Sequence, residues 1–163
     1  MKVELRQATS ADAEALWSLF APILADGTTY APDEQTGQAR FLADWFGRGG
    51  EQWVAEADGR VVGAYTVRPN QPGRGAHVAT ASYGVDASAR GLGVGLTLGT
   101  HSLERARALG YAAIQFNFVV STNGPALRLW KRLGFQVLTT LPGAFQHRQL
   151  GRVDACVLWR NLP

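Results

Sequence analysis

Apolar residues along the chain recur at two spacings, one typical of helices and one typical of strands. Helical spacing predicts about four helices, and strand spacing predicts about seven strands. The helices are expected between a cap at Thr9 or Ser10 and Leu24, at 38–46, at 94–109, and between a cap at Thr122 or Asn123 and Leu133. The strands are expected at 3–7, 52–57, 60–68, 77–86, 112–120, 135–141 and 153–160.

The order of these elements indicates an α/β (α+β) architecture in which helices flank a mixed sheet. The dipeptide Asp58-Gly59 is a strong hairpin signal between two of the strands. A long loop, 142–152, is expected between the last two strands. No repeat or linker divides the chain, so residues 1–163 are predicted to form a single domain.

Composition narrows the class of protein. The chain has 163 residues, 46% of them hydrophobic, and a formal net charge of +3. This charge is too small and too dispersed to indicate nucleic-acid binding. Cys156 is the only cysteine, which excludes an intrachain disulfide and a cysteine-based zinc site. We expect Cys156 to be a packed core thiol, no metal site, no membrane span and a cytoplasmic location.

The most informative segment is a glycine-rich turn between a strand and a helix. Tyr83-Gly84-Val85-Asp86 ends the strand, and Arg90-Gly91-Leu92-Gly93-Val94-Gly95 opens the helix. Unpaired N–H groups at a helix start favour a bound pyrophosphate, and glycines let its oxygens approach the backbone. A P-loop is excluded because no Gly-Lys-Ser/Thr follows the turn, and the spacing of the glycines does not fit a dinucleotide-binding turn. A helix-capping turn with spare glycines remains the alternative.

Two motifs carry a family resemblance. The segment 90–95 resembles the acetyl-CoA motif of the GNAT superfamily of N-acetyltransferases, Q/R-x-x-G-x-G/A. The segment 123–135 resembles that family's second motif, N-x-x-A-x-x-L-Y-x-x-x-G-F, and the order of elements matches over nearly the whole chain. The resemblance implies acetyl-CoA as cosubstrate, an amine as acceptor, and a homodimer as a family-level expectation. It also implies a mostly antiparallel sheet that is splayed near the cofactor.

The resemblance assigns cofactor contacts to specific residues. Main-chain N–H groups of Leu92, Gly93, Val94 and Gly95, together with Arg90 and Gly91, would bind the pyrophosphate. The pantetheine arm would lie between strands 77–86 and 112–120 and pair with main chain near Val85. A main-chain N–H near Gly84 or Val85 would polarise the thioester carbonyl. Gly84 is also expected to be a bulge glycine.

Proton transfer is less determined. Glu56, His77 and Asp86 are candidate bases for the acceptor amine, although each also suits an ordinary structural role, and Asp86 suits a turn cap. The resemblance implies a general acid at the position of Trp130, where the family commonly has a tyrosine. The indole of Trp130 is a poor acid, and we expect it to pack against the pantetheine or the core. Tyr83, Ser121 or water could supply the proton instead, or Asn123 could stabilise the departing sulfur.

The acceptor is a small molecule in the interpretation we favour. The segment 116–123 resembles a subgroup that includes L-azetidine-2-carboxylate acetyltransferases, with Asn117 and Asn123 matching its paired asparagines. An amide within an apolar strand needs a partner, either a ligand or neighbouring backbone. Tyr30 would close the acceptor pocket, and His147 is expected to be a solvated loop residue. Acetylation of a protein N-terminus or lysine, and a CoA sensor without turnover, remain alternatives.

Overall fold

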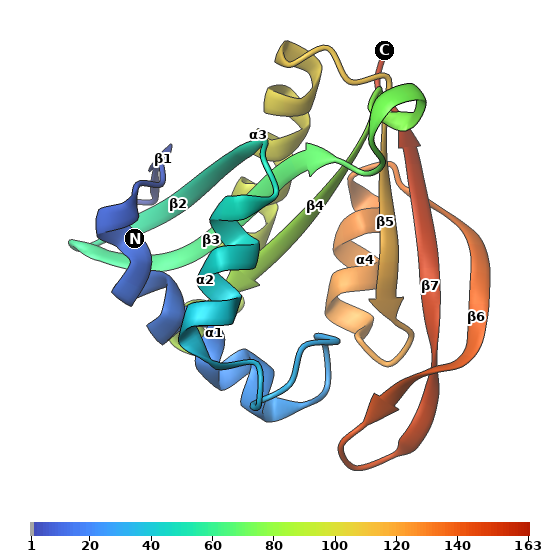
Figure 1. Ribbon diagram of the computed structural model, residues 1–163, viewed down its shortest axis with the longest axis horizontal. Helices are drawn as coiled ribbons and strands as arrows, with labels where there is room; N and C mark the ends of the chain where they lie inside the picture. The colour runs from blue at the N-terminus through green and yellow to red at the C-terminus, as the bar shows by residue number, and fades with distance from the viewer. Residues whose placement is uncertain (1) are drawn as a thin grey trace.

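A seven-stranded sheet forms the centre of the computed structural model, which describes residues 2–163 (Figure 1). The strand order is β1-β2-β3-β4-β5-β7-β6, and β4–β5 is the one parallel pair among the described strands. The strands are β1 (Glu4–Gln7), β2 (Glu51–Ala57), β3 (Arg60–Pro69), β4 (Val78–Val85), β5 (Ala113–Val120), β6 (Gln136–His147) and β7 (Gly151–Asn161). The predicted mixed, mostly antiparallel sheet is therefore confirmed.

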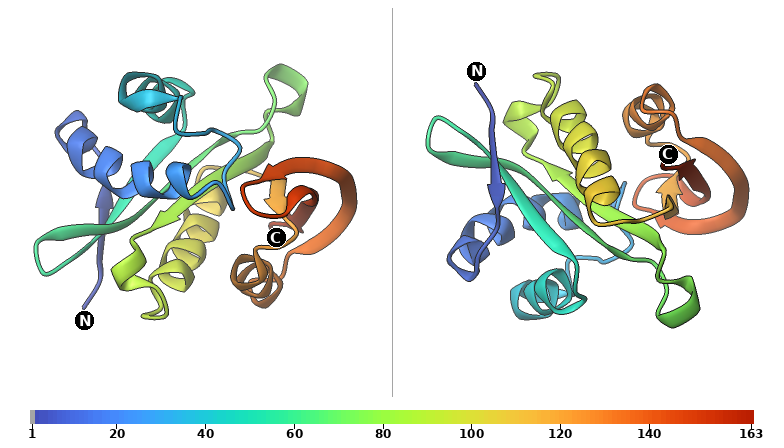
Figure 2. Two further views of the ribbon diagram at one scale, coloured as in Figure 1. Left: turned by 90° about the horizontal axis from the view of Figure 1, so that it is seen from below. Right: turned by 90° about the horizontal axis from the view of Figure 1, so that it is seen from above.

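Four α-helices in the described part of the chain cover the two faces of this sheet. They are α1 (Ala13–Asp26), α2 (Gly37–Gly47), α3 (Val94–Ala108) and α4 (Gly124–Arg132). Figure 2 shows α1 and α2 on one face and α3 and α4 on the other. Each face has its own apolar core, one around Phe20 and Trp45 and one around Tyr65 and Trp130. The sheet therefore separates the two helix pairs.

The last hairpin differs from the predicted strand–loop–strand. Strand β6 runs to His147 and β7 starts at Gly151, so most of the expected loop 142–152 pairs within the sheet. The register shifts between Leu141 and Phe145, where Pro142 and Gly143 lie. Proline and glycine are tolerated at such an irregularity because β6 is an edge strand with no ladder on its outer side. Those two residues are what made the segment resemble a loop.

Strands β4 and β5 separate soon after they begin. Their ladder contains only Val78↔Ala113 and Ala79↔Ile114, while β4 continues to Val85 and β5 continues to Val120. Beyond Ala79, β4 keeps its pairing with β3, and β5 pairs with β7. The predicted splay is thus present, and Figure 1 shows the two strands diverging toward the ends of β4 and β5.

Gly84 lies in a regular strand, so the expected bulge at this position was wrong. The β3–β4 register is unbroken from Gly63↔Val85 to Pro69↔Ala79. The glycine is required for packing, because a Cβ at Gly84 would lie 2.6 Å from Cζ of Phe20. The Phe20 side chain is fully buried on α1. The ring of Phe20 therefore rests directly on the backbone of β4.

We predict that Gly84→Ala destabilises the protein by about 1–3 kcal/mol, because the added methyl group overpacks the Phe20 site. Gly47→Ala is the matched control, since a Cβ at Gly47 meets nothing within 4 Å. Alanine also has the higher helix propensity at that position in α2. Chemical denaturation of both variants would measure the difference, and equal stability of the two would contradict the packing account.

Candidate active site

Main-chain groups of β4 face the gap that the splay opens. The Asp86 N–H donates to the Val62 carbonyl at 2.9 Å, so even-numbered residues of this strand bond to β3. Along a strand, the main-chain N–H and C=O groups of successive residues point alternately to the two sides. Those of Tyr83 and Val85 therefore point toward β5. The β4–β5 ladder has already ended at Ala79. Strand pairing therefore leaves the Val85 N–H free, whereas that of Gly84 belongs to the β3 ladder.

The glycine-rich turn follows β4 and leads into α3. The short turn η3 (Ala87–Ala89) comes first, and Gly91 and Gly93 then take φ values of 78° and 83°. These left-handed conformations disfavour residues with a Cβ. Gly93 is the N-cap of α3, and the first helical bond runs from Thr97 N to Gly93 O at 3.0 Å.

Five N–H groups of this turn and of the first turn of α3 have no acceptor within residues 2–163: those of Gly91, Gly93, Val94, Gly95 and Leu96. The N–H groups of Arg90 and Leu92 were also expected to bind the pyrophosphate. They instead donate to Ala87 O and Ala89 O at 3.4 and 3.3 Å. The free groups lie at the positive end of the dipole of a 15-residue helix. This arrangement suits a phosphate oxygen.

The three candidate bases, Glu56, Asp86 and His77, have different surroundings. The Glu56 carboxylate accepts from Arg6 Nη2 at 2.6 Å. Asp86 caps η3 by accepting from Ser88 N at 2.8 Å, and its hydrogen bonds to Ser88 lower the pKa of the carboxyl group. His77 immediately precedes β4, roughly 26 Å from Val85 along the strand. His77 is therefore too distant to remove a proton at that site directly, and Asp86 has the capping role.

Tyr83 and Trp130 pack in the core beneath α3. The Tyr83 hydroxyl bonds to Ser102 Oγ at 2.8 Å, and burial raises the pKa of that phenol. Trp130 is 6% exposed, with its ring centroid 4.7 Å from those of Tyr83 and Phe116. Of the two contacts expected for Trp130, the structure shows the one with the core, and contact with the pantetheine stays a prediction. Both side chains therefore lie in the apolar core between the sheet and helices α3 and α4.

Asn123 links β5 to α4. It is the N-cap of α4, and its Oδ1 accepts from Ala126 N at 3.3 Å. In the described chain no acceptor is assigned to its side-chain nitrogen, which leaves an N–H donor at the end of β5 where the two strands are furthest separated. The predicted capping role is confirmed.

Tyr30 reaches across from the α1–α2 loop to β4. Its hydroxyl donates to the Tyr83 carbonyl, one of the groups that the splay exposes. Its ring stands edge-on to Phe20 at 5.8 Å, and burial raises the pKa of the phenol. One side chain thus fastens this loop to the wedge between β4 and β5.

The β6–β7 turn docks on the same loop region. Arg148 N donates to Gly27 O at 3.0 Å, and the Arg148 guanidinium donates to the Ala25 carbonyl. His147 is only 8% exposed, and its Nδ1 accepts from the N–H groups of Gln149 and Leu150 at 3.1 and 3.2 Å. The expectation of a solvated His147 was wrong, because this imidazole closes the turn.

Asn117 is exposed, which corrects the assumption of a buried amide. It lies where the β5–β7 register shifts between Phe116 and Val119. Its Nδ2 donates to Asn70 Oδ1 at 2.7 Å, and its Oδ1 accepts from Gln115 Nε2 at 2.9 Å. The partners within residues 2–163 are therefore neighbouring side chains rather than backbone, and contact of Asn117 with a substrate stays a prediction.

Residues 2–163 contain no group of three or more His, Cys, Asp or Glu side chains placed to hold a metal ion. None of their helices is long and apolar enough to cross a membrane. The predicted core thiol is confirmed, because Cys156 is buried.

Comparisons with known proteins agree with this geometry. The model of the acetyltransferase (GNAT) family matches residues 14–135. The N-acetyltransferase aca1 of Schizosaccharomyces pombe is 37% identical over 104 residues, which are 63% of this chain and 50% of that protein. The chain thus spans half the length of this curated relative.

Solved structures share the fold over nearly the whole chain. A GCN5-related N-acetyltransferase from Kribbella flavida has a TM-score of 0.93 and 42% identity, covering 98% of both chains. A phosphinothricin acetyltransferase from Sinorhizobium meliloti, solved in complex with AcCoA, has a TM-score of 0.88 at 20% identity and covers 99% of this chain and 89% of that chain. With its splayed sheet and glycine-rich turn, this chain belongs to the acetyltransferase (GNAT) family.

Proposed function

We propose that this protein transfers an acetyl group from acetyl-CoA to the amine of a small molecule, an amino acid or analogue, by direct attack in a ternary complex. The observation that carries the proposal is the wedge between β4 and β5, with the free N–H of Val85 facing it and the free N–H groups of the glycine turn beyond it. Homologous GNAT proteins bind acetyl-CoA, the S. meliloti enzyme among them.

The residues present fit this cosubstrate. The N–H groups of Gly91, Gly93, Val94 and Gly95 bind the pyrophosphate, and exposed Arg90 adds a positive charge beside it. The odd-numbered residues of β4 offer main-chain groups to the pantetheine amides, as in the addition of a strand to a sheet edge. The bound cosubstrate supplies an activated acetyl thioester.

Val85 is our candidate for the oxyanion donor. Its N–H faces the wedge, whereas the Gly84 N–H is used by β3. A fixed backbone donor stabilises negative charge as it develops on the acetyl oxygen, with no reorganisation during the reaction. Gly84 contributes indirectly, because Phe20 packs on it and fixes the position of β4.

Water carries both proton transfers in this proposal: it takes the proton of the amine and gives one to the CoA thiolate, while Asn123 only stabilises that sulfur by a hydrogen bond. An alkylamine has a pKa of roughly 10 and must lose a proton before it attacks. Because Glu56 is ion-paired and Asp86 caps a turn, we propose that water removes this proton. The Asn123 side-chain N–H donates to the departing sulfur. Tyr83 is a weaker candidate than water for the acid, since burial raises the pKa of its phenol.

The acceptor would lie between the α1–α2 loop and β5. Tyr30 closes one side of this space, and the neutral amides of Asn117, Asn70 and Gln115 form a cluster beside β5. Neutral amides suit the polar groups of an amino acid or analogue better than they suit a cationic lysine-rich peptide. The resemblance of 116–123 to the azetidine-carboxylate subgroup supports the same acceptor class. A homodimer stays a prediction.

A panel of amines tests the proposed activity. We expect thiol release from acetyl-CoA with small amino acids or analogues and little release with lysine-containing peptides or protein N-terminal peptides. Turnover confined to peptides would favour the protein-acetylating alternative. Tight CoA binding without turnover on any amine would favour a CoA sensor.

We predict that Arg90→Glu raises KM for acetyl-CoA by about tenfold, because a carboxylate then faces the pyrophosphate instead of a guanidinium. Arg74→Glu makes the same charge change at an exposed position in the short turn Gly73–Gly75, before the opposite end of β4, and should leave that KM nearly unchanged. Steady-state kinetics of both variants would measure the effect. If the two variants behaved alike, our placement of the pyrophosphate would be refuted.

We predict that Tyr30→Phe raises KM for the acceptor more than KM for acetyl-CoA. The substitution keeps the ring contact with Phe20 but removes the hydrogen bond to the Tyr83 carbonyl, which fastens the loop. The lost bond should cost about 1 kcal/mol of stability. Tyr111→Phe is the control, as Tyr111 lies two residues before β5, at the end where β4 and β5 are still paired. Equal changes in both KM values would contradict a role on the acceptor side.

A further inference from the structure

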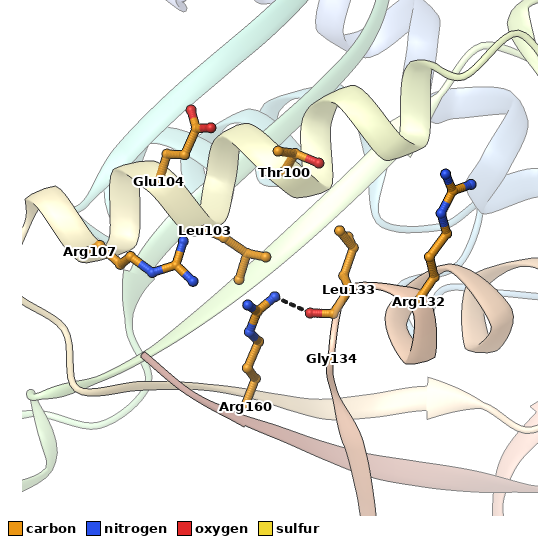
Figure 3. A pocket seen from close by; sticks show the side chains of 8 residues that line it. All are labelled: Thr100, Leu103, Glu104, Arg107, Arg132, Leu133, Gly134 and Arg160. Carbon is orange, nitrogen blue, oxygen red and sulfur yellow. Dashed lines mark hydrogen bonds between the residues drawn. The ribbon is translucent and has the colours of Figure 1, made fainter. Parts of the chain in front are cut away.

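A hollow lies near the C-terminal ends of α3 and α4, which cover the face of the sheet opposite α1 and α2. It has a volume of about 370 Å³ and is lined by the C-terminal halves of both helices and by the end of β7 (Figure 3). Three of its lining residues are arginines from three different elements: Arg107 on α3, Arg132 on α4 and Arg160 on β7. Glu104 is the single carboxylate that lines it.

These arginines have no acidic partner. Elsewhere in residues 2–163, Arg6, Arg40, Arg48 and Arg105 each pair with a carboxylate, but Arg107, Arg132 and Arg160 do not. Arg160 is half-buried, and its Nη1 donates to the carbonyl of Leu133 at the end of α4. A guanidinium has five N–H donors, so this single bond leaves several unused.

Two of the guanidinium groups point toward one another. Figure 3 shows the Arg107 side chain extending toward Arg160, while Glu104 and Arg132 point away from them. Burial lowers the pKa of Arg160, and the charge of Arg107 lowers it further to a smaller extent. The two like charges repel one another. The carbonyls at the ends of the helices offset only part of this repulsion. A bound anion would offset the rest.

We propose that this hollow binds the phosphate group of a small molecule, held between Arg107 and Arg160. Paired guanidinium forks match phosphate oxygens in charge and geometry. The site is distinct from the pyrophosphate cradle, because Arg107 lies twelve residues beyond Gly95, about 18 Å along the helix. The volume exceeds that of a phosphate ion, so the hollow has room for free phosphate or for a small phosphate ester.

The test uses ¹⁵N-labelled protein with CoA present at saturation, so that the glycine turn is already occupied. Inorganic phosphate and glycerol 3-phosphate are titrated separately, with sodium chloride at matched ionic strength as the control. We expect saturable amide shifts at 103–107 and 133–134 with both phosphates. Tighter binding of glycerol 3-phosphate would support a phosphate ester as the ligand, and equal binding would support free phosphate.

Variants separate a specific site from general charge. Arg107→Gln should weaken phosphate binding about three- to tenfold, as one charge-assisted contact is lost. Arg107 is exposed on the last turn of α3, so this variant should fold normally. Arg60→Gln removes an exposed arginine elsewhere and should bind as the parent does.

Several results would overturn the proposal. These are the same shifts with sodium chloride, equal binding by Arg107→Gln and the parent, or no shift at 103–107 in the CoA-saturated protein. Because the readout is binding at 103–107, a protein that failed to acetylate any amine would still give a clear answer about this site.

Discussion

The early end of the β4–β5 ladder is the constraint on which the rest of the site depends. Two residue pairs hold the parallel strands β4 and β5 together, and then each strand follows its antiparallel partner away from the other. Unpaired main-chain groups are costly unless a ligand or water satisfies them. The structure therefore leaves on β4 a row of donors and acceptors that a peptide-like chain can pair with. The pantetheine arm of acetyl-CoA is such a chain.

Packing on the two faces of the sheet keeps this wedge open and in place. On one face Phe20 rests on Gly84, and Tyr30 bonds to the Tyr83 carbonyl. On the other face Trp130 and Phe116 fill the space beneath β4 and β5. The residue at position 130 thus contributes volume rather than acidity.

Sequence patterns predicted the elements and their order well, because periodicity and turn residues act locally. They also located the glycine turn, since positive φ at Gly91 and Gly93 and an open helix start are local features. They failed where the outcome depends on distant neighbours. The reason for Gly84 lies on α1, the partner of Asn117 is Asn70, and Pro142 and Gly143 lie within a paired edge strand. The buried His147 was missed for the same reason.

Amide hydrogen exchange measured residue by residue, with and without acetyl-CoA, tests the central claim most directly. The account predicts fast exchange at Val85, Gly93, Val94 and Gly95 in the free protein and strong protection when acetyl-CoA is added. Gly84 and Asp86, already bonded to β3, should be protected in both states. Protection of the free protein at Val85, or no gain there on binding, would contradict a wedge that receives the cosubstrate.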